Sequence, residues 1–313
     1  MKKLLFLISS ILLTFGIQSQ VFTDDFESYS NGQYIGPAST NWTTWSGTEG
    51  GAEDVQATNA QASSGSNSIF LASTAQAGGP QDIVLEFGQQ YTDGIFTFES
   101  DFFINAGKNA YFNFQATQTL GTTWAMNCNM NNGIISIDDG VTQDLATGVY
   151  SEDSWFTLKI VANLNTGRWQ AFKDGDCIGV WRNSINEVAS LNLYPIQNSG
   201  YYVDDVMFDH ASYTPSALNA SVVSFDMGGN IAGLNVLPTA TVSNSGSTII
   251  NSFDLTLDYN GNQYVENLTG QNLNPSQFTE ITFSTPVTLV GGMNSASVEI
   301  SNINGGTDDD ISD

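Results

Sequence analysis

Short runs of apolar and β-branched residues, separated by turns rich in Gly, Asn and Asp, recur along the chain from residue 20 onward. The segments "NNG" at 131–133 and "KDGD" at 173–176 are predicted hairpin turns, because Asn and Gly tolerate the positive φ that tight turns need. No segment of this region has the apolar period of a long amphipathic helix. We therefore predict an all-β chain whose strands each bury one face.

The first part of the chain, residues 20–212, has too many predicted strands for one small sheet. Two packed sheets that form a sandwich of the jelly-roll type solve this problem, because each sheet buries its apolar face against the other. The predicted strands are Ser68–Ser73, Asp82–Phe87, Gly94–Ile104, Ala110–Thr117, Thr123–Met130, Gly133–Ile137, Trp155–Ala162, Arg168–Lys173, Cys177–Trp181, Ser190–Tyr194 and Tyr201–Phe208.

The sequence changes character after a predicted linker at 213–218, within "SYTPSAL". All six Trp residues lie before it, and the runs that follow are shorter. Several short strands in a stretch of this length indicate a smaller immunoglobulin-like sandwich over residues 219–307, which has no cysteines. We expect residues 308–313 to be an acidic tail that continues in a longer protein. The predicted strands are Ala220–Phe225, Leu237–Val242, Asn251–Asp258, Gln263–Asn267, Phe278–Phe283 and Ala296–Ser301.

The opening segment "MKKLLFLISSILLTFGIQSQ" has the order of a secretory signal: a basic start, an apolar run and small residues before a cleavage site. The apolar run is short for a membrane anchor, and no cationic stop follows it. We predict that residues 1–19 are a signal peptide for the Sec pathway. The mature chain, which has no predicted transmembrane span, is then secreted or held at the cell surface.

The charge balance limits the partners of the chain. Only 7 Lys and Arg stand against 32 Asp and Glu, which gives a formal net charge of −25. A field of this sign repels phosphate backbones and anionic headgroups, so we exclude nucleic acid as a partner. The two cysteines, Cys128 and Cys177, can form a bridge in an oxidising compartment or remain two buried thiols, and the sequence leaves both open.

Carboxylates gather at the two ends of the predicted jelly roll, in "TDDFES" and in "YYVDDVMFD". A jelly roll brings its first and last strands side by side, so these acids would repel one another unless a cation joins them. We predict a structural Ca²⁺ bound by Glu27 and Asp205, with Asp25 and Asp204 as further ligands and carbonyls from the turn at 63–68. Strand alternation would place Asp25 and Glu27 on one side and would separate Asp204 from Asp205. Solvated acidic strand ends are the alternative.

A set of motifs occurs in order along residues 22–210: "FESYSNGQYIG", "NWTTWSGTEGGAEDV", "ASSGSNSIFLA", "GKNAYFNFQ", "WAMNCNMNNG" and "YYVDDVMFD". As a set they resemble the concanavalin A-like, laminin-G/MAM-like jelly-roll modules of multidomain proteins exported by the type IX secretion route. The resemblance implies a structural Ca²⁺ between an early "FE" and a late "DDV", which here are Glu27 and Asp205 with Asp204 beside it. The segments "TATVSNSGSTIINSFDLTLDYNG" and "VENLTGQNL" follow later in the chain. With them, residues 217–307 resemble CARDB-type immunoglobulin-like modules of such proteins.

The sequence does not supply a familiar catalytic set. The segment "ESDFFI" has Glu99 and Asp101 but places Ile104 where a jelly-roll glycosidase of the laminarinase type has a second Glu. The chain has a single histidine, His210, and no G-x-S-x-G or H-E-x-x-H motif. We therefore predict that the chain is not an enzyme. The alternative is an exported polysaccharide-active glycosidase or lyase with an unfamiliar site around Glu99, Asp101 and Tyr111.

Aromatic side chains offer a more plausible ligand site, since sugar rings stack on aromatic faces beside Asn, Asp and Gln side chains. The candidate platforms are Trp45, Trp42, Tyr111 and Trp124, and for each of them packing in the core is the competing interpretation. We predict a secreted, non-catalytic recognition or adhesion module for a polysaccharide or cell-surface glycan, with the immunoglobulin-like domain as a spacer. A purely structural stalk is a further alternative.

Overall fold

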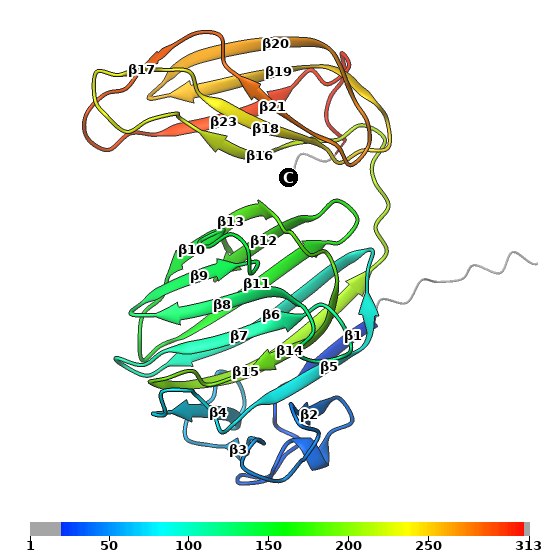
Figure 1. Cartoon of the computed structure of the whole chain (residues 1–313), viewed down its shortest axis with the longest axis vertical. Helices are drawn as coiled ribbons and strands as arrows, with labels where there is room; N and C mark the ends of the chain where they lie inside the picture. The colour runs from blue at the N-terminus through cyan, green and yellow to red at the C-terminus, as the bar shows by residue number, and fades with distance from the viewer. Residues whose placement is uncertain (1–19, 310–313) are drawn as a thin grey trace, which may run out of the picture.

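The computed structural model describes residues 20–309, in which almost all regular structure is antiparallel β-strand. One short 3-10 helix, η1 (Gly36–Ala38), is the exception among these residues. Figure 1 shows two stacked bodies, a larger one formed by the first part of the chain and a smaller one formed by the rest. The fold class predicted from the sequence, a jelly-roll sandwich followed by a smaller immunoglobulin-like sandwich, is confirmed.

Two predicted segments fall outside this description. The predicted signal peptide at 1–19 lies outside the described residues, and so do residues 310–313 of the predicted tail. Within the described part, no helix has the length and apolar character needed to cross a membrane.

The larger domain consists of an eight-stranded and a seven-stranded sheet. The eight-stranded sheet has the order β13-β12-β11-β6-β15-β4-β3, with β1 also paired to β15, and the seven-stranded sheet has the order β10-β9-β8-β7-β14-β5-β2. The first contains β1 (Gln20–Asp24), β3 (Ala57–Thr58), β4 (Ser68–Ser73), β6 (Ile95–Ile104), β11 (Trp155–Asn163), β12 (Arg168–Lys173), β13 (Asp176–Arg182) and β15 (Ser199–Ala211). The second contains β2 (Trp42–Thr44), β5 (Ile83–Tyr91), β7 (Ala110–Gln115), β8 (Trp124–Asn131), β9 (Ile134–Asp138), β10 (Ala146–Val149) and β14 (Val188–Leu193).

One continuous hydrophobic core fills the space between the two sheets. In β6 the side chains alternate, so that Phe98 and Phe102 point inward while Glu99 points outward. Phe112 and Phe114 of the other sheet meet Phe98 with ring centroids 5.7 and 5.3 Å apart. Each sheet therefore turns an apolar face inward, and binding to the sheets is left to their outer faces.

The first and last strands of the larger domain lie side by side, as the sequence predicts for a jelly roll. β1 pairs antiparallel with β15, and Phe22 lies opposite Phe208. The rings of these two residues stack with their centroids 5.3 Å apart. This pairing brings the two acidic segments to the same end of the sandwich.

The predicted alternation is wrong within both acidic segments. Strand β1 ends at Asp24, because Phe26 has a φ of +54° and turns its ring into the core. In β15 the register shifts at a β-bulge where Asp205 has a φ of +47°. The bulge lets both Val203 and Val206 point into the core, which simple alternation forbids.

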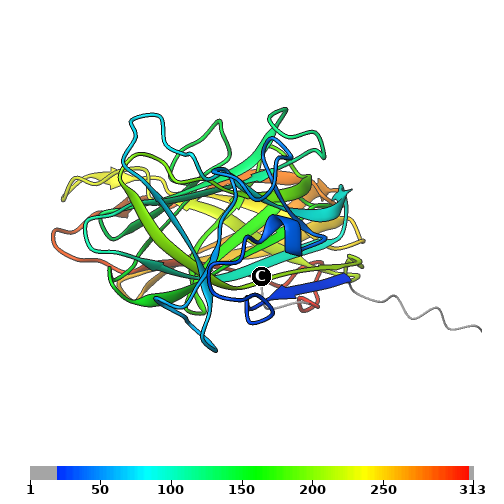
Figure 2. The same ribbon diagram turned by 90° about the horizontal axis from the view of Figure 1, so that it is seen from below.

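The segment between β1 and β4 closes one end of the sandwich. It contains η1, β2, which pairs with β5, and β3, which pairs with β4. Figure 2 shows the molecule from this end, with η1 in front of the sheets.

The smaller domain has its own core, separate from that of the larger one. Two three-stranded sheets, β16-β18-β21 and β20-β19-β23, enclose it together with the β17-β22 pair. Pro238 explains why the strand predicted at 237–242 begins only at Thr239, since proline cannot donate to a strand ladder. The strands are β16 (Ala220–Asp226), β17 (Asn235–Val236), β18 (Thr239–Asn244), β19 (Ile250–Tyr259), β20 (Asn262–Leu273), β21 (Phe278–Thr282), β22 (Val287–Thr288) and β23 (Ala296–Ser301).

The two cysteines do not form a bridge. Cys128 is buried in the core and Cys177 is exposed on β13, and both are free thiols. Burial raises the pKa of the Cys128 thiol, which keeps it protonated.

Candidate functional site

The acidic segments meet around the loop of residues 63–67. Glu27 accepts hydrogen bonds at its Oε1 atom from the backbone N–H groups of Ser66 and Asn67, at 2.7 and 2.6 Å. The Ser64 hydroxyl donates to Asp205 Oδ1 at 2.9 Å. The structure therefore brings Glu27 and Asp205, the two main predicted ligands, to one loop.

Asp204 anchors this loop from inside the protein. It is fully buried, and its Oδ2 atom accepts the N–H groups of Ser63 and Ser64 at 2.8 and 3.3 Å. Its Oδ1 atom accepts the N–H of Asp205 at 2.8 Å. Burial raises the pKa of Asp204 to about 6, even though these three donors favour the carboxylate. Both oxygens of Asp204 accept backbone hydrogen bonds, and its role as a further metal ligand stays a prediction.

Asp205 is the centre of a group of carboxylates. Partial burial raises its pKa first, and the nearby charges of Asp101, Asp25 and Glu27 raise it further. Asp101 was not among the predicted ligands. Its Oδ1 atom accepts the Thr157 hydroxyl at 2.6 Å, which fixes its carboxylate beside the same loop.

Backbone N–H groups of the 63–67 loop donate hydrogen bonds to the acidic side chains, and the sequence did not predict these bonds. The turn at 63–68, which we expected to offer carbonyl oxygens to a cation, offers N–H groups to the carboxylates, and the role of its carbonyls stays a prediction. In residues 20–309 no three acidic, His or Cys side chains are arranged as a metal site. Asp25, Glu27 and Asp205 each keep one oxygen that accepts no hydrogen bond from the described residues. Calcium binding by these three stays a prediction.

The outer face of the seven-stranded sheet carries a second polar cluster, which we call the amide row: Asn192, Asn113, Asn127 and Asp138. These residues lie opposite one another on the neighbouring strands β14, β7, β8 and β9. Asn113 Nδ2 donates to Asn192 Oδ1 at 2.9 Å, and Asn127 Nδ2 donates to Asp138 Oδ1 at 2.7 Å. The hydrogen bonds hold these side chains in fixed orientations across the sheet.

Further side chains hold the amide row from both sides. Gln115 Nε2 donates to Asn113 Oδ1 at 2.5 Å, and the Tyr111 hydroxyl donates to Asn127 Oδ1 at 2.7 Å. Burial raises the pKa of Tyr111 to about 12, so its hydroxyl remains a donor at neutral pH. Asn192, Asn113 and Gln115 are 3%, 2% and 0% exposed, so the polar groups that reach the solvent here belong to the half-buried residues Asn127, Asp138 and Tyr111.

Two tryptophans lie at the edge of this polar surface. Trp124 is opposite Gln115 in the register of β7 and β8, and its side chain is 39% exposed. The ring of Trp45 stacks on it with centroids 6.5 Å apart and an interplanar angle of 24°. Trp45 and Trp124, two of the platforms predicted from the sequence, therefore stack on each other at this edge, while Tyr111 lies on the same outer face four residues away along β7 from Gln115, the partner of Trp124.

The fourth predicted platform, Trp42, is wrongly assigned. It is 1% exposed and lies among the core side chains of the larger domain. Its indole N–H donates to Asp24 Oδ2 at 2.9 Å. A ring without an exposed face cannot stack on a ligand, so Trp42 has a packing role.

The seven-stranded sheet carries no positive charge. None of its strands contains Lys, Arg or His in the part of the chain that the structure describes. Its outer face carries the acidic side chains of Glu86 and Asp138. Such a face suits uncharged hydroxyl groups and repels anions.

The alternative catalytic site is not assembled. Glu99 and Asp101 lie on the outer face of the eight-stranded sheet, where Lys159 Nζ is 3.5 Å from Glu99 Oε2. Tyr111 lies on the outer face of the other sheet. The hydrophobic core separates Tyr111 from the two acids, so these three residues do not act on one substrate.

The protein is thus a two-domain β-sandwich protein. The outer face of its seven-stranded sheet is polar and has Trp45 and Trp124 at its edge. No protein-family model matches the chain, and no curated protein does. Solved structures match it at low identity. The cellulose-induced protein Cip1 is 15% identical, with 61% of this chain and 97% of that chain covered, at a TM-score of 0.40.

Two other solved structures show the range of the matches. Alginate lyase AlgAT5 from polysaccharide lyase family 7 is 15% identical over 55% of this chain and 95% of its own, at a TM-score of 0.40. The carbohydrate binding module CBM66 from Bacillus subtilis is 16% identical over 53% of this chain and 94% of its own, at a TM-score of 0.35. At these levels a function for this chain has to come from its own residues.

Proposed function

We propose that the larger domain binds an uncharged glycan on the outer face of the seven-stranded sheet, without catalysis. The observation that supports this proposal is the half-buried part of the amide row, Asn127 and Asp138 with Tyr111, beside the stacked pair of Trp45 and Trp124. Fixed amide and hydroxyl groups are suited to hydroxyl groups on a sugar ring, and an exposed indole is suited to the apolar face of the ring. The amide–amide hydrogen bonds keep the site ordered before the ligand arrives, which reduces the entropy lost on binding.

The charge of the face supports the choice of an uncharged glycan. A uronic or sulfated polysaccharide needs cations near its acid groups, and the seven-stranded sheet has no Lys, Arg or His in its described strands. The net charge of −25 adds a repulsive field. The proposed ligand is therefore a neutral polysaccharide or a neutral cell-surface glycan.

The smaller domain is proposed as a spacer that holds the larger domain away from another module or from a surface. Its resemblance to CARDB-type modules and the signal-like sequence at 1–19 support this role in a protein exported through the Sec pathway and then by the type IX route. In this proposal the protein acts outside the cytoplasm, where polysaccharides are accessible.

Affinity electrophoresis in gels that contain laminarin, a neutral glucan, or alginate tests the proposed ligand class. We expect the neutral polysaccharide to slow the protein and alginate to leave its mobility unchanged. The effect should vary little between about 0.05 and 0.5 M salt, because the contact uses no ion pair. Unchanged mobility in a panel of neutral polysaccharides, with and without Ca²⁺, would exclude the proposal.

We also propose, from the sequence, that Ca²⁺ binds between Asp25, Glu27 and Asp205 when these side chains turn toward one another. Burial is the main cause of the raised pKa of Asp205, and a cation would remove the repulsion by neighbouring carboxylates that adds to it. At about 100 times its dissociation constant it would stabilise the fold by about 2.7 kcal/mol and raise the melting temperature by about 5 °C or more. Differential scanning calorimetry with Ca²⁺ or a chelator measures this shift.

The double variant Glu27→Gln, Asp205→Asn is the control for calcium. It keeps the shape of both side chains and removes the two charges, so it should lose the thermal shift. An equal melting temperature for the parent protein in Ca²⁺ and in chelator would rule out a calcium site of this strength.

A further inference from the structure

A small polar notch lies on the outer face of the seven-stranded sheet, between β14 and β5. Its volume is about 60 Å³. A buried water needs about 10–15 Å³ of such space, so the notch has room for a small polar group and not for a sugar ring. Its lining residues are Glu86, Gly88 and Gln89 of β5, Ala189 and Ser190 of β14, and Gln118 and Leu120 of the loop after β7.

A bulge in β5 opens this notch. Between the pair Glu86–Ser190 and the next pair, Tyr91–Val188, four residues of β5 face one residue of β14. Gly88 lies within the bulge and has a φ of +81°, which lets the backbone leave the regular ladder. The opening is therefore a feature of the backbone.

Ser190 gives an independent sign of a ligand in the notch. Its side chain is 2% exposed, and its Oγ atom has no hydrogen-bond partner in the described part of the chain. A buried polar atom without a partner is unfavourable, so a ligand group that reaches Ser190 gains a hydrogen bond without breaking one within the protein. The hydroxyl can donate or accept this bond.

The notch lies in line with the tryptophans of the proposed glycan site. The register puts four residues in one row across β8, β7, β14 and β5: Trp124, Gln115, Ser190 and Glu86. Neighbouring strands lie about 4.8 Å apart, so Ser190 is roughly 10 Å from Trp124 across the sheet. A glycan chain that crosses the strands can therefore contact the indoles with one unit and the notch with another.

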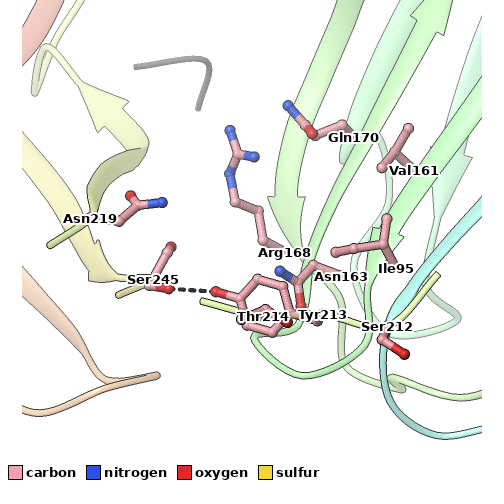
Figure 3. A pocket seen from close by; sticks show the side chains of 10 residues that line it. All are labelled: Ile95, Val161, Asn163, Arg168, Gln170, Ser212, Tyr213, Thr214, Asn219 and Ser245. Carbon is pink, nitrogen blue, oxygen red and sulfur yellow. Dashed lines mark hydrogen bonds between the residues drawn. The ribbon is translucent and has the colours of Figure 1, made fainter. Parts of the chain in front are cut away.

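The smaller domain leaves this face open. It meets the larger domain over the eight-stranded sheet, where Figure 3 shows Arg168 and Asn163 of that sheet across from Asn219 of the smaller domain. At the floor of this joint the Tyr213 hydroxyl donates to the carbonyl oxygen of Ser245. The outer faces of a sandwich point in opposite directions, so the joint does not cover the notch.

We propose that the notch binds the hydroxymethyl group of a neutral hexose unit and so selects hexose chains over pentose chains, which rests on the proposed glycan function. Four of the seven lining residues have polar side chains and none is cationic, which suits a hydroxyl on a short arm. The Glu86 carboxylate accepts a hydrogen bond from such a hydroxyl and repels the carboxylate that a uronic acid has in its place. A pentose unit has no group at this position and leaves the Ser190 hydroxyl without a partner.

Isothermal titration calorimetry of the full chain with four hexasaccharides tests the proposal. Laminarihexaose, cellohexaose and mannohexaose carry the hydroxymethyl group, and xylohexaose has the linkage of cellohexaose without it. We expect the hexose chain that binds best to bind about tenfold more tightly than xylohexaose. Ser190→Ala should weaken binding of that hexose chain about fivefold, the effect of one neutral hydrogen bond, and leave xylohexaose binding unchanged.

Ser190→Val is a second variant, because its two methyl groups fill part of the notch while the hydroxyl is removed. It should reduce the affinity for the hexose chain to that for xylohexaose. The matched controls are Ser199→Ala and Ser199→Val. Ser199 lies on β15 in the other sheet, is 3% exposed, and also has an Oγ atom without a hydrogen-bond partner in residues 20–309. Both control variants should keep the affinities of the parent protein.

Three results would overturn the proposal and leave the proposed function intact. They are equal affinity of the parent protein for xylohexaose and for the best hexose chain, unchanged hexose affinity in the Ser190 variants, or an equal loss in the Ser199 variants. If Ser190→Val does not fold, Ser190→Ala decides the second of these. Failure of all four chains to bind the parent protein would count against the proposed function itself, and the selection of hexose chains would be wrong with it.

Discussion

Replacing Trp45 and Trp124 together with alanine is expected to weaken binding of a neutral glycan about 100-fold. Each indole that stacks on a sugar ring contributes about 1.5 kcal/mol, roughly a factor of ten in affinity. The two rings stack on each other, and Trp124 is 39% exposed, so both are near enough to the surface to contact a ligand. Isothermal titration calorimetry of the double variant against the parent protein measures the loss.

Trp155→Ala is the matched control for this experiment. Trp155 is also a half-buried tryptophan on a strand, but it lies on the outer face of the eight-stranded sheet against Phe103. Its loss should lower the melting temperature and leave glycan affinity unchanged. Equal losses of affinity in both variants would show that the effect comes from stability, and the proposed face would then be wrong.

The second large effect concerns Asp204 and pH. Burial raises its pKa from the usual value of 3.8 to about 6 in the folded protein. Below the unfolded pKa the folded and unfolded states are both protonated, so the group does not oppose folding there. As the pH rises through about 6, the folded protein has to hold a buried carboxylate, and the free energy of unfolding falls by about 3 kcal/mol. The contribution of Asp204 to stability is therefore complete below pH 3.8 and is lost by neutral pH.

Asp204→Asn isolates this contribution. Asparagine leaves some of the three N–H donors without a full partner, which lowers stability by an amount that does not depend on pH. The difference in the free energy of unfolding between the parent protein and the variant should narrow by about 3 kcal/mol from pH 3 to pH 7, as measured by urea unfolding. A gap of constant size would show that Asp204 does not titrate with a raised pKa.

Asp139 provides a control of opposite sign. It is desolvated, but hydrogen bonds from Thr142, Val141 and Ser184 outweigh this effect and lower its pKa. A lowered pKa stabilises the fold above the unfolded pKa, and this stabilisation is lost as the pH falls. Asp139→Asn should therefore cost more at pH 7 than at pH 3.

Most of the strands could be predicted because their signals are local. Ser68–Ser73, Arg168–Lys173 and Ala296–Ser301 have the predicted bounds, since turn residues mark both ends. Strands β2, β3 and β10 were missed, and each has only two to four residues and too few alternating positions to give a pattern. The bulge at Asp205 was also missed, because a register shift depends on the partner strand.

The candidate site was predicted in part. Trp45, Trp124 and Tyr111 stood out as aromatic residues with polar neighbours, but nothing in the local sequence separates them from Trp42, which is in the core. The amide row was missed because it joins residues far apart, such as Asn113 and Asn192, which are 79 positions apart. Asn at alternate positions of "WAMNCNMN" was the available signal, since alternation places these amides on the polar face.

The pairing of β1 with β15 has a consequence for how the chain acquires its structure. A chain made from its N-terminus holds Gln20–Asp24 without a partner until residues 206–210 have emerged. Contacts this distant in sequence form slowly, because a long loop has to close before they give any stability. The larger domain should therefore complete its fold only after its synthesis is finished, and a ribosome stalled before Val206 should carry a nascent chain that proteases still digest.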